Sequence, residues 1–302
     1  MSPNPILRKV ALIIHAPSVP SEGGRTLPKA FGWNDPDRLV EDFIADMREA
    51  SYGIARFELA ERIEVDEFPI KADGFQYEPD QFARLRRARG KFHEPDLVDY
   101  SSLLRQFGIV DKVSSGEIDE VWLMAFPYAG YYESTMGGPG AFWCNSPPLD
   151  DTKRAQRRFV VMGFNYERGV GEMMEAFGHR AESILSKVYE GRGSADNLWE
   201  RFTRYDRQHP GASEVGNMHF APNSERDYDW GNRRSVASAC DDWYDFPNLS
   251  GVRTQVNSNE WGGGDIRLHH AWWYRHLPHV EGETGGLLNN WWAYILDPDR
   301  VR

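Results

Sequence analysis

The segment from Arg158 to Val188, RFVVMGFNYERGVGEMMEAFGHRAESILSKV, constrains the fold of this chain more than any other stretch. It opens with a short apolar run, Phe159 to Phe164, which predicts a buried strand. A helix of about twenty residues with two distinct sides is expected next. One side is apolar and collects, at helical spacing, Val170, Met173, Met174, Phe177, Ala181, Ile184, Leu185 and Val188.

The other side of this helix carries an acidic stripe. Glu172, Glu175, His179 and Glu182 fall within an arc of about 80°. The stripe contains no Lys or Arg, and like charges one turn apart destabilise a helix unless a cation or a proton lies between them. Acidic groups and a His on one helical face are typical of metal sites and of carboxylate catalytic sites. The alternative is the solvated face of an amphipathic helix.

The chain before this segment alternates between strand and helix patterns. Loops are expected between them, chiefly at residues 16–31, and one short helix within residues 66–95. Strands are predicted at residues 9–15, at 54–59 with an extension to 65, at 120–126, and as a short edge strand at Ala141–Cys144. Helices are predicted from Pro36, capped by Asn34 or Asp35, and at residues 99–107. This order predicts an α/β fold with a mostly parallel sheet and flanking helices.

Helical and strand periods fade after residue 192, whereas Trp and His become frequent. Disordered segments are poor in aromatic residues, so we expect an ordered structure here. We predict that residues 193–302 form an irregular, aromatic-rich cap packed on the α/β part, residues 1–192, as one folding unit. Such a cap would cover the carboxyl ends of the strands, where ligand sites of α/β folds form.

Composition narrows the class of partner. A net charge of −11 argues against nucleic acid and against an anionic membrane surface, so the expected partner is a small-molecule, peptide or glycan substrate. No apolar segment has membrane-spanning length and no signal peptide is seen, so we expect a cytoplasmic protein, or a secreted one if a leader has been trimmed. Cys144 and Cys240 are far apart, which excludes a thiolate zinc cluster and leaves one disulfide or two free buried thiols.

The sequence Glu175-Ala-Phe-Gly-His179 resembles the HEFGH form of the zincin metallopeptidase helix. The order of the preceding elements is also similar to the metzincin-like N-terminal subdomain. In that family two His residues one turn apart bind zinc, and the Glu after the first His is the general base. Here Glu175 occupies the first ligand position and can bind a metal through oxygen, while Ala176 occupies the base position and can transfer no proton. The resemblance implies a zincin-like fold and a divalent metal ion, with zinc expected first.

A second resemblance extends over the whole chain. It is similar to a group of bacterial proteins that share blocks like GFNYERGVGEM, HxxPN followed by DYDW, and HHxWWxxHLP followed by NNWW. This resemblance implies no activity.

Two further positions are candidates for the site. His219 lies in a Pro/Asn turn after the helix, where zincins complete their metal site; its alternative is a hydrogen-bonded loop residue. Glu133 follows a strand by a few residues and is a candidate site carboxylate, or a loop Glu bonded to backbone amides. Tyr131 beside it is a candidate substrate contact.

The cap offers an aromatic surface of two possible kinds. Flat aromatic rings can stack on sugar rings, or they can form a packed core with hydrogen-bonded histidines. The residues concerned are His269, Trp272, Trp273, His276, Asn290 and Trp291.

Three functions fit these patterns. The first is a metal-dependent hydrolase in which Glu175 and His179 are ligands, Glu182 or His219 completes the sphere, and Glu172 or Glu133 is the general base. The second is a metal-free glycoside hydrolase that uses two of the four glutamates 133, 172, 175 and 182. The third is a catalytically degenerate enzyme kept as a carbohydrate- or protein-binding module.

Overall fold

The computed structural model describes residues 3–302, and the chain divides into two compact units. The first, here called the sheet unit, comprises Arg8–Asp42 and Phe57–Phe177. The second, here called the aromatic unit, comprises Met1–Leu7, Phe43–Arg56 and Gly178–Arg302. The division passes through the continuous helix α6, Val170–Val188, whose first turns belong to the sheet unit. The boundary expected at residue 192 stays a prediction.

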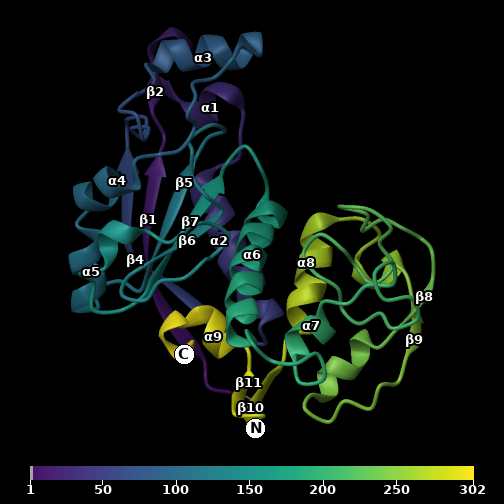
Figure 1. Ribbon diagram of the computed structural model, residues 1–302. Helices are drawn as coiled ribbons and strands as arrows, with labels where there is room; N and C mark the ends of the chain where they lie inside the picture. Colours follow the sequence, from purple (N-terminus) through teal and green to yellow (C-terminus); the bar gives the residue numbers. More distant parts are fainter. Residues whose placement is uncertain (1–2) are drawn as a thin grey trace. The chain divides into compact units, whose positions relative to one another are not determined.

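A five-stranded sheet with the spatial order β4-β1-β5-β7-β6 organises the sheet unit (Figure 1). β1 pairs with β5 and β5 with β7 in parallel, whereas β6 runs antiparallel to β7 at one edge. The strands are β1 (Ile6–His15), β4 (Ala55–Val65), β5 (Glu120–Ala125), β6 (Ser134–Gly137) and β7 (Phe159–Asn165). The predicted α/β fold with a mostly parallel sheet is confirmed.

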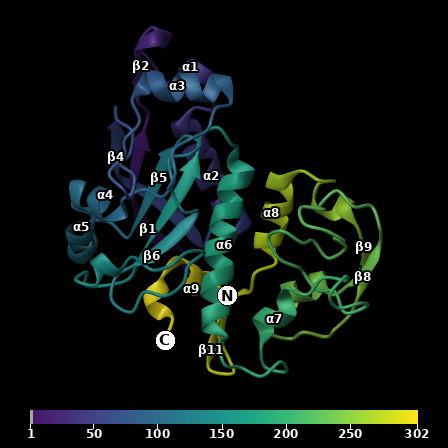
Figure 2. The same ribbon diagram turned by 45° about the horizontal axis from the view of Figure 1, so that its top comes forward.

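Helices cover both faces of this sheet. The helices of the first two-thirds of the chain are α1 (Leu27–Phe31), α2 (Pro36–Ala50), α3 (Pro79–Ala88), α4 (Tyr100–Gln106), α5 (Ile109–Ser115) and α6. α4 and α5 lie against one face in both views (Figures 1 and 2). On this face, Val121 and Leu123 of β5 form a core cluster with apolar side chains of α4 and α5. Trp122, which points to the opposite face because side chains alternate along a strand, packs with Phe57. Phe177 of α6 also contacts Phe57, so the first turns of α6 cover this second face.

The structure corrects the expected edge strand. Ala141–Cys144 forms no strand, and the edge is Ser134–Gly137 instead, which pairs with β7. The segment expected to be a loop at residues 16–31 contains a short hairpin, β2 (Ser18–Val19) and β3 (Arg25–Thr26), followed by α1. α5 was not expected either. Gly108 indicates the end of α4, and the same glycine directly precedes the first residue of α5.

The aromatic unit combines short elements. Two antiparallel pairs are present, β8 with β9 and β10 with β11. The elements are α7 (Leu198–Phe202), β8 (Val236–Ser238), β9 (Thr254–Val256), α8 (Ile266–Arg275), β10 (His279–Thr284), β11 (Leu287–Asn290) and α9 (Trp292–Leu296). Ion pairs of Arg267 with Asp46 and of Arg275 with Glu49 fix α8 to the second half of α2.

Large aromatic side chains form the core of this unit. Trp199, Phe202, Trp243, Trp273 and Trp291 contact one another with ring centroids 5.0–6.3 Å apart. Each is at least 93% buried, and rings of this size remove enough apolar surface from water to replace a regular sheet or bundle as the core.

No helix within residues 3–302 is both long enough and apolar enough to cross a membrane.

Candidate metal centre

Helix α6 supplies the first two residues of the site. Glu172 lies in its first turn and accepts a hydrogen bond from the backbone N–H of Gly169 (3.0 Å), which satisfies one of the free donors at the helix start. Glu175 follows one turn later and is only 5% exposed. Ala176 beside it is buried as well, so this turn of the acidic stripe is not a solvated helix face.

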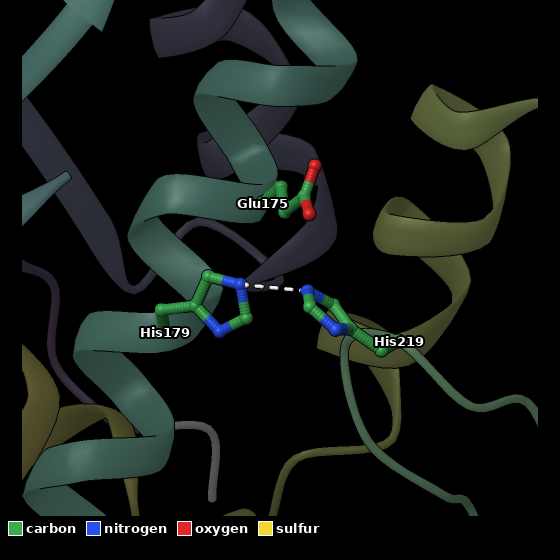
Figure 3. A group of neighbouring side chains, drawn as sticks. All are labelled: Glu175, His179 and His219. Atoms are coloured by element: carbon green, nitrogen blue, oxygen red, sulfur yellow. Dashed lines mark hydrogen bonds between the residues drawn. The ribbon is translucent and has the colours of Figure 1, made fainter. Parts of the chain in front are cut away.

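His179 meets His219, which comes from a loop of the aromatic unit. Their Nε2 atoms lie 3.0 Å apart, and the two imidazole planes are nearly perpendicular at 80°. Figure 3 shows the two rings facing each other, with the Glu175 carboxylate beside the gap between them. Glu175 and His179 stand one turn apart on the same helix, a spacing that places their side chains about 5–6 Å apart at Cβ.

A carboxylate stands behind each imidazole. Glu182 Oε2 lies 2.8 Å from His179 Nδ1, and Asp227 Oδ1 lies 3.0 Å from His219 Nδ1. Because an ionised carboxylate can only accept, both Nδ1 atoms carry a proton. In a neutral ring that is protonated at Nδ1, the Nε2 atom carries a lone pair. The lone pairs of the two rings then point at each other.

Two facing lone pairs at 3.0 Å repel unless a proton or a metal ion lies between them. Two nitrogens bound tetrahedrally to one zinc ion at about 2.05 Å are about 3.3 Å apart, close to the observed separation. A carboxylate that accepts the second ring proton is also the usual partner of a metal-binding histidine. One ligand atom each from Glu175, His179 and His219 lies within 4.8 Å of the others. This donor set fits a divalent metal ion with three protein ligands.

The loop that carries His219 is tied to α6 beside the site. The backbone N–H of Met218 donates to Glu182 Oε1 (2.9 Å), so one carboxylate holds both His179 and the loop. The contact is close because α6 has a glycine at this point: a Cβ atom added at Gly178 would lie 1.9 Å from Met218 Sδ. A side chain at position 178 would therefore need the Met218 side chain to shift.

Tyr228 borders the site on its open side. Its hydroxyl lies 3.1 Å from His219 Nε2, its ring packs on the His219 ring with centroids 4.4 Å apart, and the residue is 51% exposed. Its φ angle of 55° is unusual for a residue with a side chain, and such strain is common at functional sites. The hydroxyl is close enough to donate to a group bound at the histidine nitrogens.

A pocket of about 400 Å³ lies within the sheet unit, at the carboxyl ends of β5 and β7 and the start of α6. Tyr131, Glu133 and Glu172 all line it, together with the ion pair of Arg86 and Glu167. Glu133 Oε2 accepts a hydrogen bond from Asn145 (2.7 Å). Burial raises the pKa of Tyr131 well above its ordinary value, and its hydroxyl has no hydrogen-bond partner within residues 3–302. The structure thus brings the two predicted catalytic glutamates to one pocket.

The predicted site residues separate into three groups. Glu175, His179 and His219 come together, with Glu182 behind His179, and Glu133, Glu172 and Tyr131 share the pocket. The third group lies in or beside the aromatic core: His269, Trp272, Trp273, His276 and Trp291 are buried and Asn290 is half-buried at the end of β11. The five rings pack against aromatic neighbours in this unit, and their role in substrate binding stays a prediction.

Sequence reasoning did not single out Asp227 or Tyr228 as site residues. Tyr228 is nine residues from His219, but the loop has no period that could place its side chain. The cysteines are free and both are buried, so the disulfide alternative is excluded.

No protein-family model, no curated protein and no solved structure matches this chain.

Proposed function

We propose that the protein is a metal-dependent hydrolase whose metal ion is held by Glu175, His179 and His219. The observation that carries the proposal is the pair of Nε2 atoms 3.0 Å apart, each on a ring whose Nδ1 atom faces a carboxylate. Two histidines and one carboxylate form a common ligand set of hydrolytic zinc sites. Zinc bound in this way lowers the pKa of a coordinated water and polarises a substrate oxygen.

The chain's own residues have separate tasks in this proposal. Glu182 and Asp227 orient the two imidazoles and keep their Nε2 atoms free of protons. The Tyr228 hydroxyl donates a hydrogen bond to the oxygen that gains negative charge during hydrolysis. Ala176 cannot act as a base, so a carboxylate must accept the proton of the attacking water.

Glu175 is a metal ligand in this proposal, so the base is Glu172 or Glu133, which both line the pocket at the start of α6. Glu172 also accepts a hydrogen bond from the Gly169 N–H. A peptide or glycan is the expected substrate class.

Metal analysis of freshly purified protein tests the metal half of the proposal. We expect about one zinc, manganese or iron ion per chain at this site. His179→Ala and His219→Ala should lose it, whereas His209→Ala, a half-exposed histidine outside the group, should retain it. Asp227→Asn leaves all three ligands in place and should weaken metal binding on the order of 10–100-fold. A wild type that purifies metal-free, and whose melting temperature excess zinc or manganese does not change, contradicts the proposal.

Turnover tests the hydrolytic half. Chromogenic peptide, ester and glycoside substrates are assayed with metal-depleted and reloaded protein, and with Tyr228→Phe, which removes only the hydroxyl. Reloading should restore hydrolysis, and Tyr228→Phe should lower kcat with an unchanged metal content. Stoichiometric metal without turnover on any substrate supports the binding-module alternative.

The pocket favours the metal-free glycoside hydrolase as the second candidate, because Glu133 and Glu172 line it together. Glycosidases need two carboxylates around one bond. In that case chelator leaves turnover intact, and Glu172→Gln abolishes it while ligand binding persists.

A further inference from the structure

A second group of potential metal ligands lies within the aromatic unit and shares no residue with the first. Cys240 begins the 3₁₀ helix Cys240–Asp245, Asp241 follows it, and His276 is the first residue after α8. One ligand atom from each lies within 4.8 Å of the other two. Asp241 Oδ1 is 3.9 Å from Cys240 Sγ and 3.9 Å from His276 Nε2.

His276 is oriented for binding. Its side chain is fully buried, and its Nδ1 atom lies 2.8 Å from the backbone carbonyl oxygen of Trp272. A carbonyl oxygen can only accept a hydrogen bond, so Nδ1 carries the proton. Nε2 then carries the lone pair, which faces Cys240 and Asp241. The ring also packs against Trp272 and Tyr244, with centroids 4.3 and 4.4 Å away, which fixes its direction.

The Nε2 atom of His276 has no hydrogen-bond partner within residues 3–302. A buried polar atom without a partner costs free energy, so a metal ion, a water molecule or another ligand is expected to bind it. Asp241 at 3.9 Å is too far for a hydrogen bond, yet it is close enough for a common ligand.

We propose that Cys240, Asp241 and His276 bind one zinc ion. A thiolate and an imidazole select zinc over magnesium and calcium, which prefer oxygen ligands only. Tetrahedral ligands of zinc are about 3.3–3.7 Å apart, so the observed distances of 3.9 Å need to close by only a few tenths of an ångström. A metal-binding histidine usually donates its other ring N–H to a carbonyl or carboxylate oxygen, and here the Trp272 carbonyl oxygen accepts that hydrogen bond.

This zinc site joins two segments of the aromatic unit that no covalent link connects. Asp241 is 62% exposed on its side chain, so the fourth position of the ion is open to water or to an exchangeable ligand. The ion fastens the start of the 3₁₀ helix to the end of α8, and binding to the folded state alone stabilises the unit.

Cobalt(II) distinguishes this site from the first, because only this one contains sulfur. Metal-depleted, reduced protein is titrated with Co²⁺, and the thiolate-to-cobalt charge-transfer band in the near-ultraviolet is recorded. We expect a band equivalent to about one thiolate per chain, which added Zn²⁺ abolishes. Cys240→Ser and His276→Gln should lose the band, while His179→Ala should keep it.

Cys144→Ser is the matched control, since Cys144 is the other free, buried cysteine and lies in the sheet unit. It should retain the full band. Asp241→Asn changes an exposed side chain with little risk to folding and should weaken cobalt binding at least about tenfold. Absence of the band in folded wild type, or its persistence in Cys240→Ser, overturns the proposal.

Discussion

Gly178 offers a sharp test of how the proposed metal centre is built. It lies between Glu175 and His179 on α6, and a Cβ atom at this position would lie 1.9 Å from Met218 Sδ and 2.5 Å from Met218 Cγ. Met218 is fully buried and its backbone N–H is bonded to Glu182, so its side chain can move aside only by shifting its packed neighbours. Replacing Gly178 with Ala should therefore displace the loop that carries His219.

Two opposing free energies set the magnitude. Alanine stabilises a helix interior by about 1 kcal/mol relative to glycine. Overpacking a dense core costs about 1–3 kcal/mol. We expect Gly178→Ala to lower the free energy of unfolding by up to about 2 kcal/mol, and to weaken metal binding on the order of tenfold because His219 follows Met218 directly.

Urea denaturation and metal titration measure both effects. Gly193→Ala is the control, since its added Cβ would have no atom within 4 Å. Combining Gly178→Ala with Met218→Ala removes the overlapping atoms, so the double variant should be more stable than the sum of the two single changes, by about 0.5–3 kcal/mol. A Gly178→Ala protein that gains about 1 kcal/mol and binds metal like the wild type would refute the close approach of loop and helix.

Three further predictions concern stability. Trp273→Ala should lower the free energy of unfolding by about 3–5 kcal/mol, since the ring is fully buried, whereas Trp143→Ala, 60% exposed, should change it by less than about 0.5 kcal/mol in the same urea titration. Burial, and secondly the charge of the neighbouring His270, hold the pKa of His269 well below its ordinary value. The neutral ring therefore contributes its full stabilisation above about pH 6.5, and this contribution is lost as the pH falls below that value. His269→Phe should flatten this decline by up to about 1.4 kcal/mol per pH unit, and an unchanged slope would mean that the native ring is protonated. Asp99 caps α4; burial raises its pKa, but hydrogen bonds from Ser102 outweigh burial and lower the pKa. Asp99→Ala should lower the free energy of unfolding by about 1 kcal/mol near neutral pH. In acid titrations of unfolding, this difference from the wild type should shrink as the pH falls below about 4.

The sequence by itself determined most of the elements of the sheet unit and the proximity of Glu175 and His179 in the candidate metal centre. Apolar runs and helical spacing are local properties, so β7 and α6 begin and end close to where their residues predict. The spacing of Glu175 and His179 is equally local, because one helical turn alone brings them together. The edge strand was placed wrongly because a Gly-rich loop has no period, and only pairing with β7 selects Ser134–Gly137.

Tertiary structure decided the rest of the site. His219 reaches His179 across 40 residues of chain, and the approach depends on Gly178 leaving space for Met218. Glu182 belongs to the same stripe as Glu175, yet its carboxylate orients His179 and holds the loop, a difference that helical spacing cannot express. The abundance of Trp in the second half of the chain fits a stacking surface or a core equally well, because composition does not say which ring faces meet. Burial of Trp273 and Trp291 at 0% exposure came from packing among distant segments, and packing against Trp272 and Tyr244 fixes the direction of His276.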